Sequence, residues 1–344
     1  MHINILLHQW DLINKKINFN SIKEAGIDFI TIPIMWKRVE SEYEKWDFSY
    51  YEKIFSEIDK YDFKYIILPD SSGRTNSDDE GNPIPNTVVP DYVIFSQFDT
   101  NNNNNLIKFD EEINFQTDFY GNKVSALKYH DPFVINRTKK FYSKVIDHFS
   151  DLLGKDKIYG IALGIQQEFE IKYAQNGYKW RDYSDDLKLK FEEEHGFKPP
   201  IIDVSRSIKF MSQNNYCDGY SKLMEFREKN LINIISEISK ILKNRNLNVV
   251  GYFGEFFTSH DAIFQLSIIG ELSKYIDCAT VDYNFFDGYK NDPNPWKVPI
   301  MLSYCKHIGY KKIFGGFYVE RWREEVGVQG SPLNNKIWPV IAES

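Results

Sequence analysis

The chain has 344 residues, of which 42% are hydrophobic and 26% charged, so it can bury a large core as one α/β domain or two smaller ones. Its formal charge of -7 comes from acids and bases mixed along the whole chain without a basic block, which argues against nucleic acid and against anionic membranes as partners. The three cysteines are odd in number and far apart, which excludes a disulfide framework or a zinc knuckle and favours a reducing compartment.

The first ten residues, "MHINILLHQW", contain no basic segment, and their apolar run is too short for a signal peptide or a spanning helix. We therefore expect a cytoplasmic protein.

Short apolar runs then alternate with amphipathic ones along the chain. The apolar runs predict strands that are buried on both faces, at residues 3–7, 28–34, 64–68, 158–165, 248–253, 277–283 and 312–318. The clearest helical patterns between them cover residues 49–62, 137–154 and 220–244, with Gly154 as the expected end of the second.

Seven strand-then-helix units predict an α/β fold in which a parallel sheet closes into a (β/α)8 TIM barrel. A doubly wound open sheet is the rival, weakened because no dinucleotide-binding glycine fingerprint follows the first strand. We treat residues 1–344 as a single barrel domain. "WPVIA", at 338–342, is the expected eighth strand, but no eighth helix follows it, so we expect the C-terminal part of the barrel to be incomplete or closed irregularly.

Two long segments interrupt the alternation and are predicted as insertions after strands 3 and 4. They cover residues 71–133, which include the run "NNNNN" at 101–105, and residues 171–218, which include a helical piece. Insertions that follow barrel strands lie on the face where active sites are built, so we expect both insertions to form the sides of the substrate cleft. The Asn run is expected to be a solvated, mobile loop tip.

Acidic residues follow two of the predicted strands. Glu168 and Glu170 come after the fourth strand in "ALGIQQEFEIKY", and Glu320 ends the seventh in "GGFYVERW". Two carboxyl groups at such strand ends are what glycoside hydrolysis requires, because one protonates the leaving oxygen while the other attacks or activates water. Either acid taken alone could instead cap a helix or pair with a neighbouring cation.

Other polar and aromatic residues fall at predicted strand ends, where a sugar would lie. His8 and Asp70 are polar, and Trp36 and Trp322 offer rings on which the apolar face of a sugar could stack. The seven histidines lie mostly in predicted helices or loops, which is not the pattern of a metal-dependent barrel enzyme. The sequence contains no G-x-x-x-x-G-K-[ST] phosphate-binding loop, no H-E-x-x-H zinc-binding helix and no G-x-S-x-G nucleophile motif. We expect neither a metal nor a cofactor.

The sequence resembles the clan A retaining glycoside hydrolases, particularly the β-galactosidase-like and cellulase-like members. The segment 25–70 looks like their second and third strands, with Trp36 followed by Glu40 and by "WDFSYYE". "GIQQEFE" is similar to their fourth-strand motif, "KLKFEEEHG" to the helix after it and "FYVERW" to their seventh strand. The resemblance covers most of residues 1–322.

The resemblance implies roles for particular residues. Glu168 takes the place of the acid/base and Glu320 that of the nucleophile. Gln167 stands where the family prefers the Asn that holds the sugar 2-hydroxyl, and its amide has the same donor and acceptor at a different reach. Tyr283, followed by Asn284, matches a position whose hydroxyl often contacts the nucleophile.

Two alternatives stay open. A weaker similarity to β-amylases, in "EIKY" and "NPIPNTVVPDYV", promotes Glu170 over Glu168 and implies inversion. The substitution at Gln167 also allows a glycosidase-like barrel that binds a glycan or assists polysaccharide synthesis without hydrolysing it. The favoured prediction is a retaining glycosidase acting on a β-linked oligosaccharide or polysaccharide. The sequence does not decide the sugar, the linkage, exo or endo action, or the oligomeric state.

Overall fold

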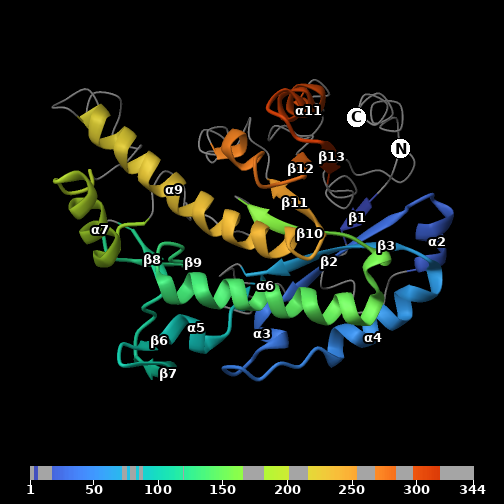
Figure 1. The fold of residues 1–344 in the computed structure, drawn as a ribbon, viewed down its shortest axis with the longest axis horizontal. Coiled ribbons are helices and arrows are strands. Elements are labelled where there is room, and N and C mark those ends of the chain that lie inside the picture. The colour runs from blue at the N-terminus through green and yellow to red at the C-terminus, as the bar shows by residue number, and fades with distance from the viewer. Residues whose placement is uncertain are drawn as a thin grey trace.

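The computed structural model describes residues 4–6, 18–71, 76–77, 83–84, 88–118, 120–165, 182–200, 216–253, 268–283 and 297–317. Its main feature is a seven-stranded sheet with the order β1-β2-β3-β10-β11-β12-β13, in which every neighbouring pair is parallel (Figure 1). The strands are β1 (Asn4–Leu6), β2 (Phe29–Met35), β3 (Lys64–Asp70), β10 (Ile158–Ile165), β11 (Asn248–Phe253), β12 (Cys278–Tyr283) and β13 (Lys312–Phe317).

The order of the strands in the sheet follows their order in the chain. A doubly wound sheet must reverse its order at a switch point, so this topology excludes that rival for the described strands. All seven predicted strands are confirmed. Within the described residues β1 and β13 are the two edges of the sheet, and the strand predicted at 338–342 lies outside those residues.

The sheet is apolar on both faces. Successive strand residues point to opposite sides, and Tyr65 and Ile67 of β3 belong to the large core cluster shared with the helices. Ile66 and Leu68 belong to a second cluster, with Ala162, Val250, Tyr252 and Cys278 on the neighbouring strands. A sheet with helices over one face and a second apolar cluster on the other is what a barrel wall requires.

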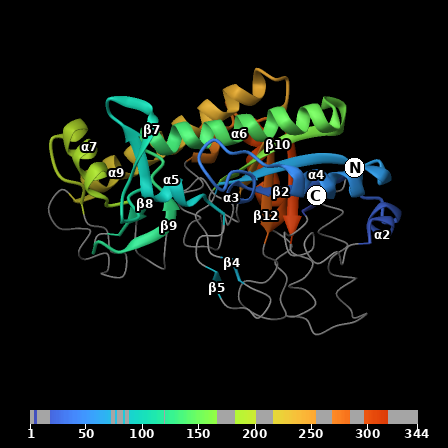
Figure 2. The same ribbon diagram turned by 90° about the horizontal axis from the view of Figure 1, so that it is seen from below.

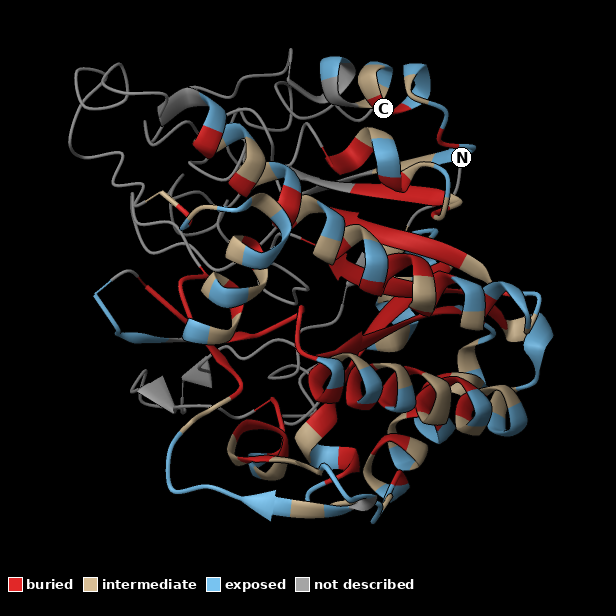
Figure 3. Ribbon diagram, turned by 60° about the vertical axis from the view of Figure 1, so that its left-hand side comes forward, coloured by how far each residue is buried: buried red, intermediate tan, exposed pale blue. Residues whose placement is uncertain are grey.

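Helices cover one face of the sheet, with α6 and α9 lying along the strands (Figure 2). In Figure 3 their buried residues face the sheet and their exposed residues face outward. The helices are α2 (Phe19–Glu24), α3 (Trp36–Val39), α4 (Ser49–Ile58), α5 (Asp91–Phe95), α6 (Pro132–Leu153), α7 (Asp185–His195), α9 (Tyr216–Lys243) and α11 (Lys297–His307), with 3-10 turns η1 (Asp59–Tyr61) and η2 (Lys155–Lys157).

The long helix α6 begins five residues before the predicted start at residue 137 because of its capping residues. The Asp131 side chain accepts hydrogen bonds from the backbone N–H groups of Phe133 and Val134, at 2.8 and 3.1 Å. Pro132 fits the first helical position, where no N–H is needed. The helix ends at Gly154, as predicted, with a φ of 78° that favours glycine.

Between β3 and α6 the chain forms α5 and three small antiparallel sheets of two strands each. These strands are β4 (Asn76–Ser77), β5 (Pro83–Ile84), β6 (Ser96–Asp99), β7 (Asn102–Lys108), β8 (Phe115–Thr117) and β9 (Lys123–Leu127). Residues 102–105 of the Asn run lie at the start of β7, directly after the turn of the β6–β7 hairpin, so the run stands at the tip of a hairpin and is mostly assigned to a strand. In the register with β6, Asp99 pairs with Asn102 and Phe98 with Leu106, so residues 103–105 form a bulge between paired positions, and Asn101, Asn102 and Asn105 are exposed as expected.

Candidate active site

The carboxyl ends of the strands define the candidate site, because parallel strands all end at one edge of their sheet. The register aligns Met35 with Asp70 at the ends of β2 and β3, and Tyr283 with Phe317 at the ends of β12 and β13. The strands β2 and β3 therefore end opposite each other at this edge, and so do β12 and β13.

Asp70, the last residue of β3, is fully buried at this edge, and its charge acts on the nearby Tyr51 and Tyr142. Tyr51 of α4 accepts a hydrogen bond from the Met35 N–H at 2.9 Å, and Tyr142 of α6 donates one to the Pro69 carbonyl at 3.1 Å. Burial raises the pKa of both phenols far above the ordinary value, and the Asp70 charge adds a smaller increase. The two helices thus hold the ends of β2 and β3 through neutral hydroxyls around a buried carboxyl group.

The Trp36 side chain is buried, whereas the sequence predicts that it is open to a sugar. Its side chain is fully buried, its ring stacks on Phe141 with centroids 4.9 Å apart and planes 3° apart, and its indole N–H donates to Glu40 at 2.8 Å. A ring with no exposed face cannot stack on a sugar, so the prediction of Trp36 as a sugar platform was wrong. The residue follows β2 as predicted, but α6 covers it.

Glu40 lies at the centre of a buried polar network beside Trp36. Its carboxyl group accepts hydrogen bonds from the Tyr92 hydroxyl at 2.7 Å and the Glu44 N–H at 2.9 Å, and it pairs with the Arg137 guanidinium at 2.5 Å. Burial raises the pKa of Glu40, and the Arg137 charge opposes that effect. A raised carboxyl pKa can mark a catalytic acid. Glu40 is fully buried and bound by four partners, so we assign it a structural role.

A second buried cluster joins the start of α7 to the turn before α6. His130 Nε2 lies 2.8 Å from Asp186 Oδ2, and Lys128 pairs with the other oxygen of Asp186 at 2.9 Å. His130 Nδ1 has no hydrogen-bond partner and lies 3.8 Å from Asp182 Oδ2. Asp182 in turn accepts from the N–H groups of Thr117 and Ser184, each at 2.8 Å.

The residues predicted to carry out the chemistry lie outside the described residues. These are His8, Gln167, Glu168, Glu170, Asn284, Glu320 and Trp322. In the sequence Glu168 comes three residues after Ile165, the last residue of β10, and Glu320 three residues after Phe317, the last residue of β13. Tyr283 ends β12, as predicted, and its backbone pairs with that of Phe317.

Sequence reasoning missed Tyr51, Tyr142 and Arg137. The tyrosines occupy apolar positions of amphipathic helices and look like ordinary core residues in the sequence. Arg137 could have been recognised from the sequence, because it interrupts the apolar face that Phe133, Val134 and Phe141 form on α6. A cation at a core position requires a buried anion, and Glu40 is that anion.

Within the described ranges, no group of three or more His, Cys, Asp or Glu side chains is arranged to hold a metal ion. In the same part of the chain, no helix is both long and apolar enough to cross a bilayer.

Comparison with known proteins finds similar folds among solved structures only. No family model matches the sequence, and no curated protein sequence matches it significantly. Solved structures do match. The catalytic domain of the β-amylase of Paenibacillus polymyxa superimposes with a TM-score of 0.65 at 12% identity, over 99% of this chain and 98% of that one.

Two β-galactosidases also share the fold. The enzyme of Marinomonas ef1 matches with a TM-score of 0.61 at 8% identity over 91% of this chain and 47% of its own. The enzyme of Bacillus circulans sp. alkalophilus matches with a TM-score of 0.56 at 12% identity over 99% of this chain and 55% of its own. The chain therefore shares the fold of these β-amylase and β-galactosidase structures, and it spans about half the length of the two β-galactosidases.

Proposed function

We propose that this protein is a glycoside hydrolase acting on an oligosaccharide or polysaccharide. The observation that carries the proposal is a parallel sheet whose strand order follows the chain, in a fold shared with β-amylase and β-galactosidase structures. In the sequence, Glu168 and Glu320 come three residues after the last residues of β10 and β13. Active sites on barrel sheets are built at the carboxyl ends of the strands.

In the proposed mechanism Glu168 is the acid/base and Glu320 the nucleophile. Glu320 attacks the anomeric carbon while Glu168 protonates the leaving oxygen, and Glu168 then removes a proton from the water that releases the sugar. Two inversions at one carbon retain its configuration. His8, Gln167, Tyr283, Asn284 and Trp322 are proposed to bind the substrate. Asp70 is fully buried, so we assign it to the support of the strand end and not to substrate contact.

The test is the anomeric configuration of the first product, followed by proton NMR during hydrolysis of an aryl β-glycoside. We expect retention. Glu320→Ala should lose nearly all turnover but fold normally, and added azide should restore turnover of an activated substrate and give a glycosyl azide of inverted configuration. Undiminished hydrolysis by Glu320→Ala would remove Glu320 from the mechanism.

A second candidate is an inverting hydrolase that uses Glu170. The match to the β-amylase catalytic domain favours it, because that match has the highest TM-score of the three and covers nearly the whole of both chains. An inverted first product from an α-glucan, with activity lost in Glu170→Gln, would support this candidate against the first. Binding of glycans without turnover of any substrate would instead support a non-hydrolytic barrel.

A further inference from the structure

The ring of His130 lies between two carboxylates, in the turn that precedes α6. Only 1% of its side chain is exposed. Its Nε2 lies 2.8 Å from Asp186 Oδ2, and its Nδ1, which makes no hydrogen bond to the described residues, lies 3.8 Å from Asp182 Oδ2. Asp131, the next residue in the chain, caps the start of α6. Because Asp182 lies just before α7 and Asp186 in its first turn, the ring joins α7 to the turn before α6.

The doubly protonated form of the His130 ring is the one that matches these surroundings. A neutral imidazole has one N–H, so either Nε2 or Nδ1 then presents a lone pair to a carboxylate. The imidazolium presents an N–H to each carboxylate. Asp182 accepts hydrogen bonds from the N–H groups of Thr117 and Ser184 and from the Ser184 hydroxyl, as an ionised carboxylate does. The geometry therefore favours a positive charge on His130.

Three cations lie around the same cluster, and each is directed at an oxygen atom. Lys128 contacts Asp186 at 2.9 Å, and Lys190 donates to the backbone carbonyl of the histidine at 2.9 Å. Arg227 of α9 donates to the Asp182 carbonyl at 3.0 Å. These cations oppose a further positive charge, but each ring nitrogen has a carboxylate as its partner.

The apolar part of the α7 contact is small. Of the 11 residues of α7, Leu187 and Phe191 are the buried ones, and Leu189 is 60% exposed. Ser184 at the N-cap makes no side-chain capping hydrogen bond. Elements with few buried apolar contacts are the ones that open by local unfolding. The charges around His130 therefore decide how firmly α7 is held.

We propose that His130 is a pH-sensitive contact that holds α7 against the turn before α6 while it is protonated and releases α7 when it loses its proton. An ion pair that the protonated ring gains on folding stabilises the folded state at low pH, and this contribution is lost as the pH rises. Imidazole is the side chain whose charge ordinarily changes near neutral pH. The inference does not depend on the proposed hydrolase activity.

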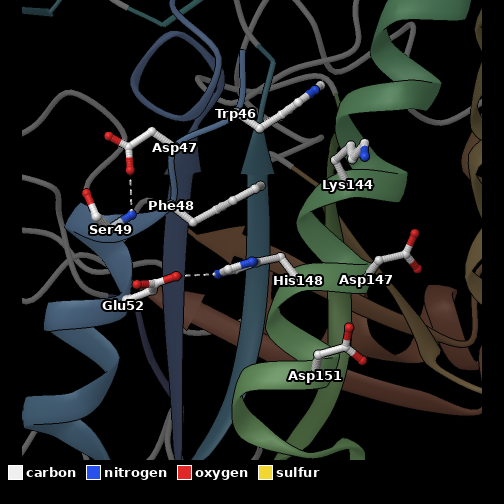
Figure 4. Close-up of a pocket in the computed structure, with 9 residues that line it drawn as sticks. All are labelled: Trp46, Asp47, Phe48, Ser49, Glu52, Lys144, Asp147, His148 and Asp151. Atoms are coloured by element: carbon white, nitrogen blue, oxygen red, sulfur yellow. Dashed lines mark hydrogen bonds and ion pairs between the residues drawn. The ribbon is translucent and has the colours of Figure 1, made fainter. Parts of the chain in front are cut away.

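His148 provides a comparison within the same protein. It pairs with a single carboxylate, that of Glu52 in α4, whose Oε1 lies 3.0 Å from His148 Nε2 (Figure 4). Its side chain is 28% exposed, and the pair joins α6 to α4. A neutral ring can present its one N–H to a single carboxylate, so titration of His148 should leave α7 unaffected.

The test is hydrogen exchange of the full chain, followed by mass spectrometry at about pH 6 and about pH 9 and corrected for the intrinsic effect of pH on exchange. We expect the protection of α7 to fall about tenfold relative to that of α4, because a hydrogen bond to a charged group becomes a neutral one. His130→Gln keeps a side-chain donor that cannot change its charge, and it should remove the difference between the two conditions. Nitrogen NMR of histidine-labelled protein should show both His130 ring nitrogens protonated at the lower pH.

The matched controls are His148→Gln and His195→Gln, the second of which removes the histidine at the end of α7 itself. Both variants should keep the pH dependence of α7, and thermal melting checks that they are folded. Equal protection of α7 at the two pH values would overturn the proposal. So would a pH dependence that persists in His130→Gln or disappears in His195→Gln, or a His130 ring with one proton at the lower pH. If His130→Gln does not fold, the wild-type exchange, the NMR spectrum and His195→Gln still decide.

Discussion

Arg137 connects three parts of the chain through one side chain. It extends from α6 to Glu40 after β2 and lies near Tyr92 of α5, with its guanidinium carbon 4.7 Å from the Tyr43 ring centroid. Only 2% of the side chain is exposed, so its charge depends on the acids beside it. A buried pair of this kind adds little net stability, but loss of one member leaves the other charge buried without compensation.

Arg137→Met should therefore lower the free energy of unfolding by about 3 to 5 kcal/mol, measured by urea denaturation. Adding Glu40→Gln should recover part of the loss, because the amide stays neutral and can still accept from the Trp36 indole. Glu44→Gln, which affects the 40% exposed partner of Arg137, should cost less than about 1 kcal/mol. A loss in Arg137→Met no larger than that of Glu44→Gln would show that the buried pair is not the dominant contact.

Glu168 and Glu170 can be distinguished by their dependence on the leaving group. An acid that protonates the leaving oxygen matters most when that oxygen is a poor leaving group. Glu168→Gln should therefore reduce kcat/KM strongly on an alkyl glycoside and weakly on a dinitrophenyl glycoside, with Glu170→Gln as the matched control. Equal losses on both substrates would argue against Glu168, and the selective loss appearing in Glu170→Gln would transfer the role to that residue.

At the scale of elements, α7 is fixed to the rest of the chain by charges at its first turn. Asp186 contacts His130 and Lys128, which come from the turn between β9 and α6, and Lys190 one helical turn later donates to the His130 carbonyl at 2.9 Å. Burial alone would raise the pKa of Asp186, but the hydrogen bond and charge of His130, together with Lys128, outweigh it and hold that pKa well below its usual range.

This lowered pKa predicts a loss of stability in acid. Since the folded pKa of Asp186 lies below the unfolded value of about 3.9, its contribution is complete above that value and is lost as the pH falls toward the folded pKa. The urea midpoint of the wild type should therefore fall more steeply between pH 5 and 3 than that of Asp186→Asn. Asp185→Asn is the matched control, because its side chain is 93% exposed. Parallel pH profiles for wild type and Asp186→Asn would contradict the assignment.

At the scale of the whole molecule, the sequence predicts the sheet better than its surroundings. A strand buried on both faces appears as a continuous apolar run, and all seven described strands of the sheet have one. The hairpins between β3 and α6 were not predicted, because exposed two-stranded pairs such as β6 and β7 need no apolar pattern. In that segment the Asn run falls on the tip and bulge of the β6–β7 hairpin, where polar side chains can stay exposed.

In the candidate site, too, one property could be predicted from the sequence and another could not. Asp70 ends β3 as predicted, opposite the end of β2, but its side chain is fully buried there and not open to a ligand. The burial of Trp36 could not be predicted, because it depends on Phe141, which is more than a hundred residues away in the chain. Sequence position therefore identifies the edge of the sheet where a residue lies, while packing between helices decides whether it is open to a ligand.

The strand order has a further consequence for how the chain folds as it is synthesised. Each strand of the sheet pairs with the strand that precedes it in the sheet order, so the growing chain can add strands one at a time to an existing edge. Two steps differ, because residues 71–157 separate β3 from β10 and residues 166–247 separate β10 from β11, so much longer loops must close at both. We expect nascent chains to pause twice, first with β1 to β3 assembled and the β3 edge exposed and then with β10 added and its edge exposed, and chaperone binding in the cell would concentrate at those two stages.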